Sequence, residues 1–223
     1  MALDDSTAAA LRRLGTATLH EAQGQSGAMA SAIKPIEPAM RLLGTAATVY
    51  APANDNLMIH YALSKAQPGD VLVVDAQGFV EGGAWGDLMT TAAQAAGIAG
   101  LVIDGAVRDS SDIIAMGFPI FARALSIKGT VKTRRGRYGE PVCCGGVTVH
   151  PGDIVLGDRD GVVVIARDRL AKVIAAAEAR EAKEEAIRTR LEAGESTVEV
   201  LARIRFNPGR ILRQRRSSRI RWA

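Results

Sequence analysis

Apolar residues form runs of different kinds along the chain, and each kind predicts a different element. Continuous apolar runs at Val71–Asp75 and Gly100–Asp104 predict strands that are buried on both faces of a sheet. A further strand is predicted at Gly44–Ala51, and helices are predicted at Asp87–Ala96 and Asp168–Ala193. Because no linker rich in Pro, Gly or Ser separates these elements, the sequence predicts a single domain.

Two shorter motifs predict where elements begin and end. Thr18–Glu21 (TLHE) fits a capping box, and therefore predicts the start of a helix that the glycines at 24 and 27 end. Val142–Val149 is predicted to be one strand, followed by a turn at His150–Asp153. The second half of the chain is therefore expected to be rich in strands joined by short turns.

Composition is that of a globular protein with a sizeable core. The 223 residues are 48% hydrophobic and 23% charged, and no apolar run is long enough to span a bilayer. The N-terminal segment carries acids where a signal peptide would carry basic residues. Cys143 and Cys144 are adjacent, so in a strand they point to opposite faces and are poor disulfide partners. We therefore expect reduced thiols and a cytoplasmic protein.

The net charge of +4 originates in the C-terminal segment. Asn207–Ala223 carries six arginines and no acid, and without them the chain has 22 basic and 24 acidic residues. The domain is expected to span residues 1–206, with 207–223 as a disordered Arg-rich tail. A second basic stretch, at 132–137, is expected to be a solvated loop. Nucleic acid is not expected as a partner, because no aromatic residues are interleaved with these basic residues.

Gly82–Asp109 combines a glycine-rich turn, a helix, a buried strand and a charged pair. Glycines before the helix at Asp87 would let backbone N–H groups face an anion, and the helix dipole adds positive potential there. Arg108 and Asp109 follow the strand, and could supply a carboxylate clamp and a ligand for a hard cation. We therefore interpret this unit as a metal-assisted site for a small oxo-acid.

Five segments carry a resemblance to one known family: GGAWGDL (82–88), AAQAAGIAGLVIDG (92–105), RD (108–109), GFPIFA (117–122) and GGVTVHPGDIVLGDRDGVVVI (145–165). They resemble the 4-hydroxy-4-methyl-2-oxoglutarate aldolases and the regulator of ribonuclease activity A, over most of the chain from Leu14 to Leu201. The resemblance implies an α/β fold with a central β core and flanking helices, of the swivelling β/β/α type. It also implies a homotrimer, or a homohexamer of two trimers, with the active site at the subunit interface.

The activity that the resemblance implies is that of a lyase, a divalent-metal-dependent (class II) pyruvate aldolase. With Mg²⁺ or Mn²⁺ it would cleave 4-hydroxy-4-methyl-2-oxoglutarate, or a related 4-hydroxy-2-oxo acid, to pyruvate and a second oxo-acid. Oxaloacetate decarboxylase activity is expected at the same site, because both reactions pass through the pyruvate enolate. No lysine occurs in Gly82–Asp109, which argues against a Schiff-base aldolase.

The charged pair carries the central roles that the resemblance implies. Asp109 would be the direct metal ligand, since one carboxylate is enough for Mg²⁺ when waters and substrate oxygens fill the other positions. Asp109 could also cap the helix that begins at Ser110. Arg108 would hold the pyruvyl carboxylate and stabilise the enolate catalytically. The alternative for Arg108 is an ordinary surface salt bridge.

The remaining candidate residues lie at two helices. The substrate carboxylate would bind the backbone at the start of the first helix, formed by Gly86, Asp87, Leu88 and Met89. Asp87 would also act in catalysis by holding a water, although it could instead only cap its helix. Glu184 would be the catalytic acid that a neighbouring subunit contributes, although a solvated helix face is an equal alternative for it.

Two other functions were weighed against the aldolase. A non-catalytic protein that binds and masks an RNA-processing ribonuclease is the main alternative, and the intact catalytic motif argues against a pure binder without excluding it. Methyl transfer to a quinone is disfavoured, because the sequence shows no glycine-rich cofactor loop followed by an acid-tipped strand.

Overall fold

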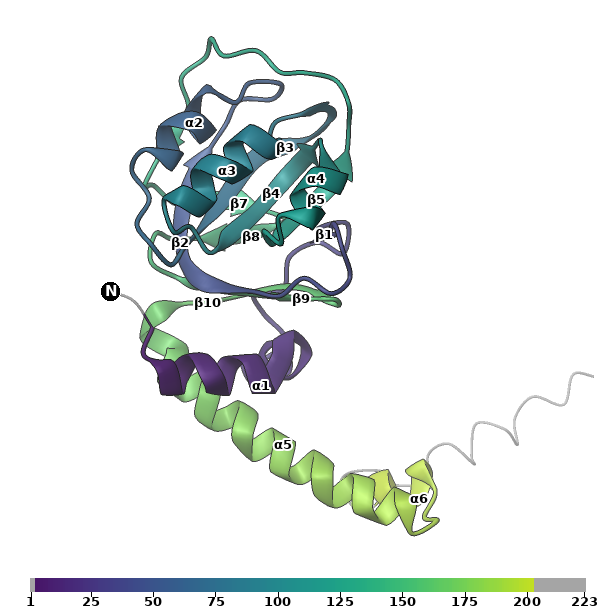
Figure 1. Ribbon diagram of the computed structural model, residues 1–223. Coiled ribbons are helices and arrows are strands. Elements are labelled where there is room, and N and C mark those ends of the chain that lie inside the picture. The colour runs from purple at the N-terminus through teal and green to yellow at the C-terminus, as the bar shows by residue number, and fades with distance from the viewer. Residues whose placement is uncertain (1–2, 203–223) are drawn as a thin grey trace, which may run out of the picture. The chain divides into compact units, whose positions relative to one another are not determined.

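The computed structural model describes residues 3–202, and its central element is an eight-stranded sheet (Figure 1). Neighbouring strands follow the order β1-β5-β4-β3-β2-β9-β10, and β6 pairs with β2. Strands β2 to β5 are parallel, and the others join antiparallel. The bounds are β1 Lys34–Pro35, β2 Leu42–Tyr50, β3 Asp70–Gly83, β4 Gly100–Val107, β5 Ile120–Leu125, β6 Arg137–Tyr138, β9 Ile154–Asp158 and β10 Gly161–Ile165.

The helices flank this sheet and confirm the mixed α/β class. They are α1 Asp5–Ala22, α2 Leu57–Leu63, α3 Asp87–Ala95, α4 Ser110–Ala115, the 3-10 turn Arg167–Arg169, α5 Leu170–Glu192 and α6 Thr197–Ala202. In the described part of the chain, no helix has the length and apolarity needed to cross a membrane. The parallel strands alternate with α2, α3 and α4, so each strand returns to the same sheet through a helix, as βαβ connections require.

Both faces of the parallel strands are covered, as their continuous apolar sequences predict. Every residue of β4 is buried. One face packs against Ile59, Ala93 and Ile113, which come from α2, α3 and α4. The other face packs against residues of a separate hairpin, formed by β7 Val142–Cys144 and β8 Val147–Val149. Figure 1 shows the three helices in front of the parallel strands and the hairpin behind them.

The chain forms two compact units, Met1–Glu178 and Ala179–Ala223. The first contains the whole sheet and α1 to α4. The second contains the later part of α5, together with α6. The predicted Arg-rich tail at 207–223 lies outside the described residues.

Two predicted boundaries are wrong, and glycines explain both. The capping box at Thr18 does not open a helix, because α1 is already helical from Asp5 and is broken at Gly15, where φ is 72°. The carboxylate of Asp158 caps the second part instead, accepting hydrogen bonds from the N–H and hydroxyl of Thr16 at 2.9 and 2.7 Å.

The second wrong boundary lies at residues 142–149, which form a hairpin and not one strand. Gly145 and Gly146 both have positive φ, of 57° and 79°, which is the backbone of a type I′ turn. Within the hairpin Cys143 is exposed and Cys144 is buried, so the prediction of opposite faces and free thiols is confirmed. Burial raises the pKa of the Cys144 thiol, which therefore stays protonated and unreactive.

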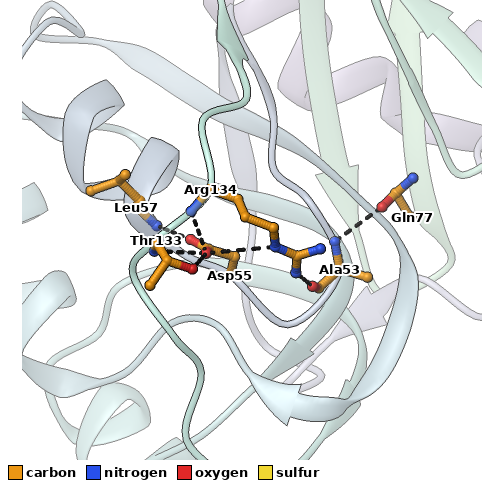
Figure 2. A network of polar contacts seen from close by, with 6 residues as sticks. All are labelled: Ala53, Asp55, Leu57, Gln77, Thr133 and Arg134. Atoms are coloured by element: carbon orange, nitrogen blue, oxygen red, sulfur yellow. Dashed lines mark hydrogen bonds and ion pairs between the residues drawn. The ribbon is translucent and has the colours of Figure 1, made fainter.

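A buried carboxylate at the start of α2 fastens a long loop to the sheet. Asp55 is 2% exposed, and its carboxylate accepts hydrogen bonds from the N–H groups of Leu57, Thr133 and Arg134, and from the Thr133 hydroxyl. Figure 2 shows these bonds converging on the Asp55 carboxylate, with the Arg134 side chain reaching on to the carbonyl of Ala53. Burial raises the pKa of Asp55, but the hydrogen bonds lower it further, and the net pKa is about 2.

Acid should therefore destabilise the protein through Asp55. Because its pKa falls on folding from the ordinary 3.8 to about 2, the ionised carboxylate stabilises the fold fully above that ordinary value and loses this contribution as the pH drops toward 2. The shift corresponds to about 2 kcal/mol. Urea unfolding of wild type and Asp55→Asn should show this difference at neutral pH, shrinking between about pH 4 and pH 2. A difference that stays constant down to pH 2 would contradict the assignment.

Candidate active site

The glycine-rich turn after β3 is held between β4 and α3. Ala84 N–H donates to the carbonyl of Ala106, and Arg108 N–H donates to the carbonyl of Trp85, each at 2.9 Å. The Trp85 side chain is 1% exposed and donates from Nε1 to the Thr90 hydroxyl at 2.7 Å. Its ring stacks on Phe118, with centroids 6.0 Å apart. A buried aromatic anchor of this kind fixes the position of the backbone on either side of it.

Gly86 is the point at which this turn meets the charged pair. A Cβ at Gly86 would lie 2.4 Å from Asp109 Oδ2 and 3.2 Å from Arg108 Nε. The first distance is shorter than real Cβ contacts, so any other residue would push the carboxylate away. The φ of Gly86 is −146°, a value open to all residues, so glycine is needed for the close approach and not for the backbone angle.

Asp109 has the position of a helix cap but does not serve as one. It precedes α4 in the left-handed conformation, with φ 55° and ψ 36°, and its side chain makes no capping hydrogen bond. Its Oδ2 instead accepts from the N–H of Asp87 and pairs with Arg108 Nε, both at 3.3 Å. The interpretation of Asp109 as a side-chain cap is therefore wrong. Aspartate adopts this left-handed conformation more readily than most residues, and Gln25, Asn54 and Gln77 also have positive φ.

The start of α3 leaves backbone donors unused beside the carboxylate. Gly86 is the N-cap, and no side chain caps the helix, so the interpretation of Asp87 as the cap is also wrong. The N–H groups of Leu88 and Met89 precede the first intrahelical bond, which joins Thr90 N–H to the carbonyl of Gly86. The Leu88 side chain is 77% exposed and the Met89 side chain is buried. These two residues can therefore offer an anion their backbone N–H groups.

Arg108 is accessible enough to bind a ligand. Its side chain is 43% exposed, and that of Asp109 is 32% exposed. An ion pair at this exposure contributes about 0–1 kcal/mol, so an anionic ligand could replace it at little cost. The guanidinium therefore provides a fixed positive charge beside the N-terminus of α3.

The donors at this site fit a hard divalent cation held by one protein ligand. Asp109 Oδ1 forms no hydrogen bond within residues 3–202, so one carboxylate oxygen is available. The described residues include no group of three His, Cys, Asp or Glu side chains that could surround a metal ion. Mg²⁺ and Mn²⁺ accept such a site, because water and substrate oxygens complete their coordination, whereas a structural zinc site needs more protein ligands.

Glu184 belongs to the second unit of the chain. It lies on α5, where Arg180 Nε contacts its Oε1 at 2.8 Å in an i, i+4 pair. Gly86, Asp87, Arg108 and Asp109, in contrast, lie together in the first unit.

Sequence reasoning missed the residues behind the turn. Asn56 Nδ2 donates to the carbonyl of Ala84 at 3.0 Å, while its N–H donates to Val131 at 3.1 Å. Asn56 thus ties the glycine turn to the loop that Asp55 fastens. The sequence Asn54-Asp55-Asn56 before a helix was a usable signal, because these residue types favour turns and helix starts.

Comparisons with known proteins identify the family of the chain. A family profile described as RraA-like (Aldolase/RraA) matches residues 16–164. A candidate 4-hydroxy-4-methyl-2-oxoglutarate aldolase of Halalkalibacterium halodurans is 38% identical over 175 residues, covering 78% of this chain and 83% of that protein.

Two solved structures share the fold. One is RraAS2 of Streptomyces coelicolor, described as an unusual member of the RNase ES inhibitor RraA family. It has a TM-score of 0.73 and 28% identity, and the match covers 84% of this chain and 98% of that chain. The other is the RNA-processing inhibitor RraA from Thermus thermophilis, with a TM-score of 0.63, 28% identity, and coverage of 68% and 92%. The chain belongs to the RraA-like family of aldolases and RraA proteins.

Proposed function

We propose that the protein is a divalent-metal-dependent lyase that cleaves 4-hydroxy-2-oxo dicarboxylates, such as 4-hydroxy-4-methyl-2-oxoglutarate, to pyruvate and a second oxo-acid. The observation that carries this proposal is the position of Asp109. Its carboxylate leaves its own helix uncapped and lies against Gly86, 3.3 Å from Arg108. The 38% identical candidate aldolase of Halalkalibacterium halodurans supports the same reaction class.

The chain's own groups would bind and orient the 2-oxo acid end of the substrate. The N–H groups of Leu88 and Met89 would hold the 1-carboxylate, as helix N-termini commonly hold anions. The Arg108 guanidinium would lie beside the 2-oxo oxygen and stabilise the negative charge that develops there. A Mg²⁺ or Mn²⁺ ion held by Asp109 would supply Lewis-acid stabilisation of the same charge.

Cleavage then proceeds as a retro-aldol reaction. The 4-hydroxyl gives its proton to a water held by Asp87, and the C3–C4 bond breaks. The electron pair moves onto the pyruvyl fragment as an enolate, while C4 becomes the carbonyl carbon of the second oxo-acid. A water protonates C3 of the enolate to give pyruvate. Oxaloacetate would lose CO₂ to reach the same enolate, so we expect decarboxylase activity at this site.

A second copy of the chain would complete the site in a homotrimer or homohexamer. Arg108 and Asp109 supply one guanidinium and one carboxylate, which are too few groups to enclose a dicarboxylate. Large apolar residues that are exposed include Leu88 (77%) on α3, Leu125 (56%) at the end of β5, and Ile127 (96%) just after β5. Glu184 of the neighbouring subunit would be the acid that acts on the distal part.

Binding to a ribonuclease is the alternative, because two structural relatives carry names of RNA-processing inhibitors. The position of the Asp109 carboxylate against Gly86 and the uncapped start of α3 favour catalysis, since a docking surface needs neither feature.

Metal removal should abolish the reaction reversibly. Pyruvate release from oxaloacetate and from 4-hydroxy-4-methyl-2-oxoglutarate should cease in excess EDTA and return with Mg²⁺ or Mn²⁺, because a site with one carboxylate binds these ions weakly. Coupling to lactate dehydrogenase, with free pyruvate as the control for the coupling enzyme, measures both reactions. Full turnover in excess chelator would refute the metal-dependent mechanism.

Gly86→Ala and Asp109→Asn should each lower kcat at least about 100-fold. The new Cβ in Gly86→Ala would displace the Asp109 carboxylate, and Asp109→Asn removes the negative charge of that carboxylate. Their melting temperatures should stay near the wild-type value. Asp112→Asn is the matched control, since Asp112 is an exposed acid in the first turn of α4. Arg108→Lys should also lose activity, because an ammonium cannot make a bidentate contact. Wild-type turnover in Gly86→Ala would show that the close approach has no catalytic role.

Two inactive variants should complement each other if the site is shared between chains. Glu184→Ala and Asp109→Ala, unfolded together and reassembled, should regain part of the activity, because some interfaces would receive both intact residues from different chains. Each variant reassembled alone is the control. Mixed oligomers, confirmed by native mass spectrometry but without activity, would remove Glu184 from the site of a neighbouring chain.

A further inference from the structure

We propose that residues 126–134, here called the strap, form a wall beside Arg108 that selects the distal group of the substrate, and that Asp55 is the positioning residue that holds this wall. The inference rests on the proposed function for the identity of the substrate. Figure 1 shows the loop that follows β5 arching above the sheet toward α2.

The first half of the strap is bonded to the elements that carry the site. Ser126 N–H donates to the carbonyl of Val107, directly before Arg108, at 2.9 Å. Gly83 N–H, in the glycine turn, donates to the carbonyl of Lys128 at 2.9 Å. A Cβ at Gly83 would lie 2.5 Å from the Ser126 carbonyl and 2.9 Å from Arg108 Cβ. The strap, the glycine turn and Arg108 are therefore in direct contact.

The second half of the strap is bonded to the start of α2. Val131 N–H donates to the carbonyl of Asn54, and Asn56 N–H donates to the carbonyl of Val131, at 3.0 and 3.1 Å. Asp55 then accepts from the N–H groups of Thr133 and Arg134, both at 2.8 Å. Figure 2 shows the Asp55 carboxylate between Thr133 and Arg134 of the strap and Leu57 of α2. One buried carboxylate thus fixes where the strap ends.

Gly129, in the middle of the strap, faces the guanidinium. Among the described residues, Arg108 Nη1 is the one atom within 4 Å of a Cβ at this position, at 3.9 Å. The space beside Arg108 is therefore open on this side, and its width depends on the strap. A substituent at C4 of the substrate, beyond the carbons that Arg108 and α3 hold, needs such space.

The charge of the strap suits an anionic distal group. Lys128 pairs with Glu81 at 2.6 Å, and Arg134 lies 3.9 Å from the Asp55 carboxylate, so Lys132 is the strap cation best placed to meet an anionic group. The positive charge of Lys132 also lowers the pKa of His60, after the larger effect of burial. We therefore assign the wall to the distal carboxylate and C4 substituent, and the α3 N-terminus to the proximal carboxylate.

Two dianions of different length distinguish the contribution of the wall to binding from that of the rest of the site. Oxalate mimics the pyruvate enolate and should reach only Arg108 and α3. In contrast, 2-oxoglutarate has the five-carbon dicarboxylate chain of the proposed substrate without the 4-hydroxyl and 4-methyl groups, and is not cleaved. In the presence of Mg²⁺, titration calorimetry should show that Asp55→Asn weakens 2-oxoglutarate binding about tenfold and leaves oxalate binding within about twofold. Hydrogen exchange at the Thr133 and Arg134 amides should accelerate in the same variant.

Asp158→Asn is the matched control. The Asp158 carboxylate accepts three hydrogen bonds, from the N–H and hydroxyl of Thr16 and from Asp160 N–H, compared with four at Asp55. It lies at the end of β9, next to the start of β2. It should lower stability without changing the affinity for either dianion. Gly129→Leu, whose backbone angle permits a side chain, should weaken 2-oxoglutarate more than oxalate.

Equal weakening of both dianions in Asp55→Asn, or no weakening of 2-oxoglutarate while the strap amides exchange faster, would overturn the proposal. The binding experiment needs no turnover, so the outcome is independent of the lyase assay. If wild type binds both dianions but releases no pyruvate, the proposed function fails and the wall stands. If wild type releases pyruvate but the strap variants bind both dianions normally, the proposed function stands and the wall proposal fails.

Discussion

The absence of a side chain at Gly86 allows the contact on which the whole site depends. Without a Cβ there, Asp109 Oδ2 approaches the glycine turn and Arg108 Nε lies beside it. This close approach requires the ends of β3 and β4 to lie side by side. They are joined there by two hydrogen bonds, from Ala84 N–H to the Ala106 carbonyl and from Arg108 N–H to the Trp85 carbonyl. The Trp85 ring is buried against Phe118 and holds the glycine turn in this position. The sheet thus fixes the backbone of the turn, and the missing side chain at Gly86 leaves space for the Asp109 carboxylate.

Several common rules of local structure are broken at this junction. Asp109 has a left-handed backbone, α3 begins without a side-chain cap, and two N–H groups at its start have no intrahelical partner. These features cost stability, and the surrounding parallel strands, buried on both faces, can bear that cost. The Asp55 carboxylate, in contrast, is buried and accepts four hydrogen bonds from Leu57, Thr133 and Arg134. We infer that the first region is built to accept a ligand and the second to hold a wall in place.

Much of this arrangement could be predicted from the sequence, because the signals were local. Apolar runs located β3 and β4, and glycines followed by Asp87 located the start of α3. The hairpin at 142–149 was missed although Gly145-Gly146 between two short apolar runs is itself a signal for a two-residue hairpin turn. The role of Asp55 was out of reach, since its partners Thr133 and Arg134 are nearly eighty residues away in the chain. Long-range hydrogen bonds of this kind leave no periodic signal in the sequence.

The most direct test of the central claim is to count bound Mn²⁺ by electron paramagnetic resonance. Wild-type protein should bind one Mn²⁺ per chain, and oxalate should broaden its signal by replacing coordinated water. Asp109→Asn should lose this ion, whereas Asp112→Asn should retain it. Tight, oxalate-sensitive Mn²⁺ binding that survives in Asp109→Asn would contradict the account, because the ion would then lie away from the contact at Gly86.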